Sequence, residues 1–210
     1  MGPKTNSVRL LTNVYEMAGA VLSGKGRYTT INELTDQIPA TRPDVLDAAL
    51  DLLVNVHPIP TIGSVVLSEE DKGAALAGLF SMRVWLPLAM ARHNVPYKIP
   101  GSFVVPLSME YADGELLING LKEYDKVILI DDTLASGGTM AALVEAVRLF
   151  GAEVVDIRVV VEKLGYGGRD RVSQVTDVPI HSGIGIRVYD REDKPAVVRV
   201  EEVLGCAVPE

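Results

Sequence analysis

The chain has 210 residues, with 28 acidic against 20 basic side chains, a formal net charge of −8 and a single cysteine, Cys206. Hydrophobic residues make up 48 % of it, which supplies a core and excludes both a disordered chain and a disulfide scaffold. No uncharged apolar run reaches the roughly 18 residues of a membrane span, and the first residues lack a signal peptide's apolar stretch, so we expect a cytoplasmic protein without membrane contact. The acidic balance favours a small-molecule partner over nucleic acid.

The first sixty residues differ from the rest because their pattern is helical. Apolar spacing predicts a helix over 8–22, and Thr30-x-x-Glu33 is a capping-box pattern that predicts a second, short helix. Pro43 opens a third helix that runs to about Asn55. We interpret residues 1–60 as a helical cap, or hood, and a dimer element.

This order of helices would also suit a helix-turn-helix, and a DNA-binding regulator is therefore an alternative. The charge pattern opposes it, because the segment holds six acidic and five basic side chains. The third helix would also present acidic side chains to DNA phosphates, those of Asp44, Asp47 and Asp51. We therefore expect no nucleic-acid partner.

From Ser64 onward, short apolar runs alternate with helical stretches, which is typical of an α/β fold with a parallel sheet. The pattern predicts strands at 65–67, 85–91, 126–130 and 153–162, and helices at 73–84 and 139–150. Trp85 and the valines between 154 and 161 are expected in the core. Residues 61–210 should form this core domain, with residues 94–124 as a flexible lid or a small hairpin.

Residues 127–140 read VILIDDTLASGGTM, a buried strand followed by two carboxylates, a loop of small residues and the start of a helix. Backbone amides at such a helix start can converge on a phosphate, because glycine allows close approach and the first-turn amides are unpaired. The predicted phosphate-binding residues are Ala135, Ser136, Gly137, Gly138 and Thr139. Asp131 and Asp132 would repel the phosphate itself, so they suit sugar hydroxyls or a divalent cation beside it.

The whole string resembles the binding signature of type I phosphoribosyltransferases, which hold 5-phosphoribosyl 1-pyrophosphate (PRPP) in this loop. A P-loop is excluded because no Gly-Lys-Ser/Thr follows the glycines, and a dinucleotide site is excluded because the Gly-x-Gly-x-x-Gly spacing is missing. The resemblance covers residues 64 to about 185 and implies an α/β type I phosphoribosyltransferase core.

Further segments look like those of adenine phosphoribosyltransferases. The pyrophosphate loop of those enzymes is similar to Asp71, Lys72 and Gly73, although Lys72 stands where they have an arginine. Arg92 stands where they carry an Arg-Lys pair, and Lys98 and Glu110 resemble residues of their flexible catalytic loop. The resemblance implies pyrophosphate binding by Asp71, Lys72, Gly73, Arg92 and Lys98, and an approach of Glu110 to the incoming base.

The same resemblance implies a Mg²⁺-dependent reaction in which Asp131 and Asp132 orient the ribose hydroxyls and, indirectly, Mg²⁺ brought with PRPP. It also places Val161, Glu162 and Lys163 in the base pocket. A homodimer or higher homo-oligomer is expected.

The base is the open question. The run Gly167-Gly168-Arg169-Asp170-Arg171 resembles adenine enzymes, and it favours purine salvage from adenine and PRPP to AMP and pyrophosphate. Lys163 favours the alternative of a 6-oxopurine (hypoxanthine, guanine or xanthine), because a lysine only donates and would suit an exocyclic oxygen. The alternative outside the enzyme class is a purine-responsive transcriptional regulator with the same fold.

Overall fold

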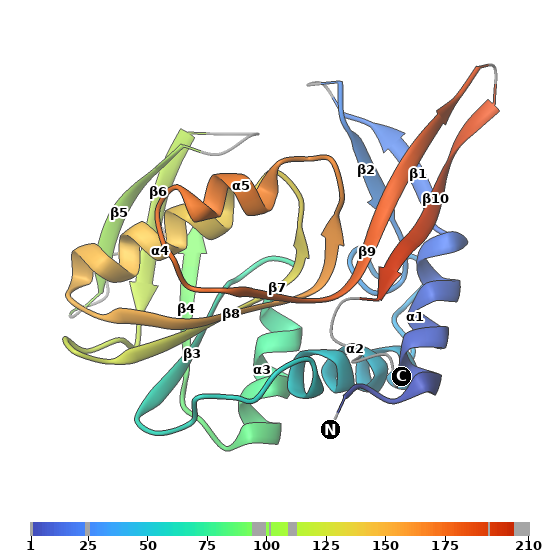
Figure 1. The fold of residues 1–210 in the computed structure, drawn as a ribbon. Coiled ribbons are helices and arrows are strands. Elements are labelled where there is room, and N and C mark those ends of the chain that lie inside the picture. The colour runs from blue at the N-terminus through green and yellow to red at the C-terminus, as the bar shows by residue number, and fades with distance from the viewer. Residues whose placement is uncertain are drawn as a thin grey trace.

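The computed structural model describes residues 2–23, 26–93, 100, 102–108, 113–192 and 194–203. An eight-stranded sheet with the order β10-β9-β8-β7-β3-β4-β6-β5 forms its centre (Figure 1). Its strands are β3 (Ser64–Glu69), β4 (Leu88–His93), β5 (Phe103–Ser108), β6 (Asp113–Asn119), β7 (Lys126–Leu134), β8 (Glu153–Lys163), β9 (Ile180–Arg191) and β10 (Lys194–Val203). The five middle strands from β9 to β4 are parallel, whereas β10, β6 and β5 are antiparallel to their neighbours.

Helices cover both faces of the sheet, which confirms the expected α/β architecture (Figure 1). One face is covered by α4 (Gly138–Phe150) and α5 (Gly168–Ser173), and the other by α1 (Thr5–Glu16), α2 (Pro43–Asn55) and α3 (Ala74–Val84). The valine run of β8 is buried on both sides, since Val159 belongs to one apolar cluster and Val160 to the other. The core therefore has two layers that share the sheet.

The N-terminal segment differs from the prediction of three helices. The first helix ends at Glu16, and β1 (Gly19–Leu22) pairs antiparallel with β2 (Tyr28–Ile31), which contains Thr30. The residues of β2 are aromatic or β-branched and therefore favour a strand, and the hairpin lies against β10, so tertiary contact outweighs the capping-box pattern (Figure 1). The third predicted helix is confirmed as α2.

These differences remove the basis of the helix-turn-helix alternative. Within residues 2–23 and 26–60, the structure has two helices separated by a hairpin and a turn, not three consecutive helices. The prediction that the third helix presents Asp51 to the outside was also wrong. Asp51 is buried and accepts a hydrogen bond from the backbone N of Lys4 at 2.7 Å. The segment is built to pack on the sheet.

Trp85 is neither in a strand nor in the core, contrary to prediction. It ends α3 in the left-handed conformation with φ 59°, and 89 % of its surface is exposed. Pairing with β3 begins only at Pro87, whose carbonyl accepts from Val66 N at 2.8 Å, so β4 starts later and ends at His93. Arg92 consequently lies within the end of this strand.

The segment 94–124 was predicted to be either a flexible lid or a small hairpin, and the described part of it contains a hairpin. β5 and β6 pair antiparallel, and β6 pairs antiparallel with β4, so this hairpin extends the sheet at its edge. Lys98 and Glu110 lie outside the described residues. Among the described helices, none is long and apolar enough to cross a membrane.

Candidate active site

The carboxyl ends of β3, β4 and β7 meet at one edge of the sheet. β3 is the parallel neighbour of both other strands, with Leu67 opposite Leu129 and Glu69 opposite Ala91. This register brings the loop after β3, which holds Asp71, Lys72 and Gly73, beside the acidic end of β7. Such an edge is where open α/β folds bind ligands.

Asp131 is in direct contact with the loop after β3. Its Oδ1 accepts a hydrogen bond from the backbone N of Asp132 at 2.8 Å. A Cβ placed on Gly73 would lie 2.9 Å from this Oδ1 and 2.5 Å from Ser68 Oγ, so any larger residue would displace these side chains or the loop. The predicted ribose site and the predicted pyrophosphate loop therefore touch.

Asp132 follows Asp131 in β7, and its charge is, after burial, one of the causes that raise the pKa of Asp131. Its side chain is buried, and its Oδ2 accepts a hydrogen bond from Thr133 Oγ1 at 2.9 Å. Burial, followed by the charge of Asp132, raises the pKa of Tyr15 in α1. The Asp132 carboxylate therefore acts on Asp131 and also on the N-terminal helix α1.

The edge concentrates negative charge. Burial raises the pKa of Asp131 well above its usual value, and the neighbouring charges of Asp132 and Glu69 add to the effect. Burial likewise raises the pKa of Glu69, against the lowering influence of His93, whose Nε2 lies 2.5 Å from the Glu69 carboxylate. Carboxylates held together in this way favour a cation or hydroxyl groups over an anion.

The predicted phosphate loop follows β7. This strand ends at Leu134, four residues later than predicted, because its last residues pair with β8. Gly137 has φ 73°, and α4 starts at Gly138 with no acidic residue in its first turn. A Cβ on Gly137 would collide with the carbonyl oxygen of Gly168 in α5, and a Cβ on Gly168 with that of Ala135. The loop is thus shaped by α5, and the first-turn amides of α4 can bind an anion.

Arg171 of α5 adds a cation at this loop. Its Nη1 lies 3.2 Å from the position of a Cβ on Gly138. Across the described part of the chain, Arg171 has no ion pair. The loop therefore combines a helix N-terminus with a guanidinium group.

Two of the predicted pyrophosphate-binding cations have acidic partners. Lys72 Nζ donates to Asp36 Oδ1 at 2.6 Å, and Arg92 Nε lies 3.9 Å from Glu70 Oε2. The Arg92 Nε is buried and has no hydrogen-bond partner among the described residues. Asp71, in the same loop, is exposed.

The three residues predicted for the base pocket separate at the end of β8. Val161 packs in the core against the N-terminal helices. Glu162 binds Arg169 through both carboxylate oxygens and accepts from Ser182 Oγ at 2.8 Å. Lys163 is 7 % exposed, and its ammonium group donates to the carbonyl oxygen of Tyr28 at 3.3 Å. Its side chain therefore faces the N-terminal hairpin.

Tyr166 completes the surroundings of Lys163. Its hydroxyl donates to the carbonyl oxygen of Tyr28 at 3.0 Å and accepts from the backbone N of Tyr28 at 3.2 Å. The Lys163 ammonium lies 5.6 Å from the centre of the Tyr166 ring. The β1–β2 hairpin is thereby fixed over the end of β8.

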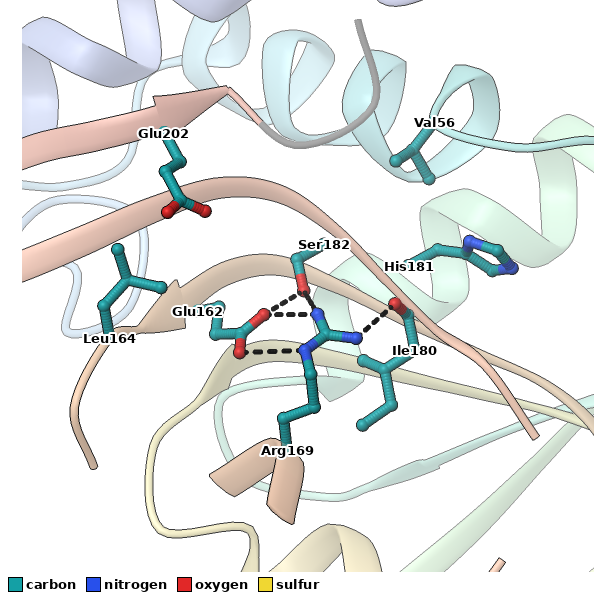
Figure 2. Close-up of a pocket in the computed structure, with 8 residues that line it drawn as sticks. All are labelled: Val56, Glu162, Leu164, Arg169, Ile180, His181, Ser182 and Glu202. Carbon is teal, nitrogen blue, oxygen red and sulfur yellow. Dashed lines mark hydrogen bonds and ion pairs between the residues drawn. The ribbon is translucent and has the colours of Figure 1, made fainter. Parts of the chain in front are cut away.

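Glu162, Arg169 and Ser182 line a cavity of about 510 Å³ (Figure 2). The other lining residues are Val56, Leu164, Ile180, His181 and Glu202. Figure 2 shows the guanidinium of Arg169 bound by Glu162 and Ser182 and donating to the carbonyl oxygen of Ile180, 2.9 Å away. Asp131, Asp132, Lys163 and the phosphate loop do not line this cavity, which opens beside the part of β9 that β10 leaves unpaired.

Sequence reasoning missed the residues that reach the site from distant segments. Asp36 and Tyr28 come from the N-terminal segment, and no local pattern marks them, since their partners Lys72 and Tyr166 lie far along the chain. Arg171 belongs to the run that resembles adenine enzymes, but the sequence did not place it beside Gly138. The pairing of Asp36 with Lys72 becomes visible only in the folded chain, where the two charged groups meet.

Replacing Gly73 with alanine tests the contact between the two loops. The added Cβ meets the ends of two side chains, Ser68 and Asp131, so we expect the fold to be retained while the loop shifts. The KM for PRPP should rise about tenfold. The shifted loop would lose roughly one hydrogen bond to a charged group of PRPP, and such a bond contributes about this much to binding. Steady-state kinetics with a thermal unfolding control measures it. An unchanged KM would show that this contact does not shape the PRPP site.

Comparisons with known proteins identify the family. Residues 45–190 match the family model of the phosphoribosyl transferase domain. The chain is 36 % identical over 168 residues to a hypoxanthine/guanine phosphoribosyltransferase of Methanothermobacter marburgensis, covering 79 % of this chain and 86 % of that protein. It is 31 % identical over 183 residues to one of Methanocaldococcus vulcanius, covering 87 % and 97 %.

Solved structures of similar fold include adenine phosphoribosyltransferases. The one from Rhodothermus marinus has a TM-score of 0.67 and 22 % identity, covering 85 % of this chain and 98 % of that chain. The one from Saccharomyces cerevisiae has a TM-score of 0.65 and 18 % identity, covering 85 % and 99 %. The chain belongs to the phosphoribosyltransferase family, and the expected type I fold is confirmed.

Proposed function

We propose that this chain transfers a 5-phosphoribosyl group from PRPP to a 6-oxopurine, hypoxanthine or guanine, and releases pyrophosphate. A base nitrogen forms the new bond to the ribose carbon, and the bond from that carbon to the pyrophosphate oxygen breaks. The nitrogen loses its proton, and the pyrophosphate leaves with the bonding electrons. Such a reaction needs placed charges rather than a protein nucleophile.

The observation that carries this proposal is the contact of Gly73 with Asp131, with the phosphate loop directly after β7. It supports one continuous site for the three parts of PRPP. The amides of Ala135 to Thr139, with Arg171, would bind the 5′-phosphate, and Asp131 and Asp132 the ribose hydroxyls. The pyrophosphate would lie against Lys72, Gly73 and Arg92.

The same edge suits Mg²⁺. Two carboxylates adjacent in sequence, one with a pKa raised by burial and by its acidic neighbours, form a donor set of the oxygen type that Mg²⁺ prefers. Asp131 and Asp132 would hold the ion together with PRPP oxygens, and the ion would neutralise charge on the pyrophosphate. Within the described residues no group of three or more His, Cys, Asp or Glu is arranged to hold a metal ion.

The base assignment rests on Lys163. Its buried ammonium can only donate hydrogen bonds, which suits the oxygen of a 6-oxopurine and opposes the amino group of adenine. The relatives at 30 % identity or more bear the name hypoxanthine/guanine phosphoribosyltransferase, which supports the same base.

The run Gly167–Arg171, which favoured adenine in the sequence, makes structural contacts in this fold. Arg169 binds Glu162, Ser182 and Ile180, Gly168 packs on the phosphate loop, and Arg171 lies beside Gly138. A supporting role of this kind suits a phosphoribosyltransferase for any base, so the string is weak support for adenine.

The deciding experiment measures Mg²⁺-dependent turnover with PRPP and a panel of hypoxanthine, guanine, xanthine, adenine and orotate. We expect hypoxanthine or guanine to have the highest kcat/KM. A higher value for adenine would restore the original prediction, and no turnover with any base would overturn the enzymatic function.

The homodimer stays a prediction. Exposed apolar side chains of Met82, Trp85 and Leu88 offer one surface for it, and light scattering measures the oligomeric state.

A further inference from the structure

A tight turn in the N-terminal segment reaches the pyrophosphate loop. Asn32 Oδ1 accepts from the backbone N of Leu34 at 2.9 Å and from that of Thr35 at 3.2 Å. Asp36 Oδ2 accepts from Asn32 N at 3.1 Å and from Thr35 Oγ1 at 2.6 Å, and Asp36 N donates back to the Asn32 carbonyl at 3.0 Å. These bonds fix the turn and leave Asp36 Oδ1 pointing outward from it.

That remaining oxygen binds Lys72. The Nζ to Oδ1 distance is 2.6 Å, and the side chains of Asp36 and Lys72 are 13 % and 35 % exposed. Among the described residues, Asp36 is the one hydrogen-bond partner of this ammonium, so it takes one of three N–H donors. The others stay available at the edge of the sheet.

Lysine needs such a partner more than arginine would. Its ammonium is a point charge on a flexible stem, whereas a guanidinium is a pre-organised fork that loses less freedom for each hydrogen bond it forms. A rigid carboxylate that holds the ammonium in one place removes part of the ordering that an anionic ligand would otherwise require. The turn at residues 32–36 supplies this carboxylate from outside the sheet.

The charge of Lys72 is also protected. Burial would lower its pKa, but the hydrogen bond and charge of Asp36 and the charges of Asp132 and Asp71 raise it above the ordinary value. Burial acts against Asp36 too, yet its pKa is lowered by Lys72 and by the bonds within the turn. The pair is therefore ionised at neutral pH.

We propose that Asp36 is a positioning residue that holds the Lys72 ammonium for the pyrophosphate of PRPP, so that the N-terminal segment completes the pyrophosphate site. The inference rests on the proposed function. It assigns the turn at residues 32–36 a role in binding, beyond the packing of a cap on the sheet.

The chain offers a matched control. Asp47 on α2 pairs with Arg83 on α3 at 3.2 Å, and this pair also joins the N-terminal segment to the helix after the pyrophosphate loop. Its side chains are 60 % and 46 % exposed, so it is a surface ion pair of small energetic weight. Asp47→Asn removes one ion pair between the same two parts without touching the site.

The test compares Asp36→Asn, Asp36→Glu and Asp47→Asn with the parent. Asp36→Asn keeps the shape of the turn and removes the charge, so we expect the KM for PRPP and the dissociation constant of Mg²⁺-pyrophosphate to rise about tenfold, the worth of one charge-assisted hydrogen bond. The KM for the base should change little, Asp36→Glu should recover part of the loss, and Asp47→Asn should match the parent. In Lys72→Met, adding Asp36→Asn should cause no further loss.

The outcomes separate the two proposals. If the parent turns over PRPP with a base but Asp36→Asn only lowers the unfolding temperature, with both PRPP constants unchanged, Asp36 is structural and the inference is wrong. Additive losses in the double variant would overturn it as well. If the parent has no turnover with any base, the proposed function fails first, and calorimetry with Mg²⁺-pyrophosphate still reports on the Asp36–Lys72 pair.

Discussion

Replacing Asp131 or Asp132 with asparagine is expected to lower kcat at least about 100-fold, the size of effect seen when a placed charge is removed from a reacting group. Both carboxylates stand at the end of β7 directly before the predicted phosphate loop, and Asp131 lies beside the predicted pyrophosphate loop. An amide of the same shape cannot neutralise Mg²⁺ or accept as strongly from ribose hydroxyls. The loss should fall mainly on the rate, with a higher Mg²⁺ concentration needed for half-maximal activity.

Stability should move in the opposite direction for Asp131. Its pKa is raised in the folded chain, so this group costs folding free energy at neutral pH, and that cost declines as the pH falls from the raised pKa towards the ordinary pKa of an aspartate. Asp131→Asn removes the cost at neutral pH, and its unfolding temperature should equal or exceed that of the parent. Wild-type turnover in both variants would show that the ribose site lies elsewhere. A variant that is inactive and unfolds earlier would instead indicate a structural role.

The part of this site that the sequence could predict is local. A strand, two acids and a glycine loop follow one another within residues 127–140, and the chemistry of each residue depends on its neighbours in the chain. Parallel strands then bring the loop at Asp71, Lys72 and Gly73 to the same edge. Periodicity predicted β8 and α4 closely for the same reason.

What could not be predicted depends on contacts between distant segments. The pattern Thr30-x-x-Glu33 satisfies a local rule for a helix, yet Thr30 pairs with Ala20 in a hairpin that is stabilised by β10. Arg158 interrupts an apolar run, and only the fold shows it fully buried, with hydrogen bonds to Asp156 and to the carbonyl oxygens of Leu53 and Pro58. The partner of Lys72 is equally invisible, because Asp36 lies 36 residues away.

The Gly167–Arg171 string shows the same limit for function. Its likeness to adenine enzymes favoured adenine, but in the fold Gly168 and Arg171 support the phosphate loop and Arg169 binds Glu162. A supporting element of the predicted phosphate loop can be the same whatever base is bound. Sequence similarity in such an element therefore carries little information about the base, and the proposed assignment depends on Lys163 instead.

Replacing Lys163 with methionine is expected to abolish the preference for a 6-oxopurine. The ammonium lies 3.3 Å from the Tyr28 carbonyl oxygen and 5.6 Å from the centre of the Tyr166 ring, so these contacts hold it at the end of β8. Losing a hydrogen bond from a charged donor to the base oxygen should cost about 1.5 to 3 kcal/mol, roughly ten- to a hundredfold in kcat/KM for hypoxanthine. Methionine has a similar length and no donor, so adenine turnover should stay the same or rise.

The measurement is the ratio of kcat/KM for hypoxanthine to that for adenine in the parent, in Lys163→Met and in Lys126→Met, an exposed lysine at the start of β7. The ratio should fall at least tenfold in Lys163→Met alone, the lower bound of the charged hydrogen bond. A general loss of stability would lower both bases together and leave the ratio unchanged, which separates packing from recognition. A parent that prefers adenine, with the same ratio in Lys163→Met, would mean that the ammonium points away from the base and serves only to hold Tyr28.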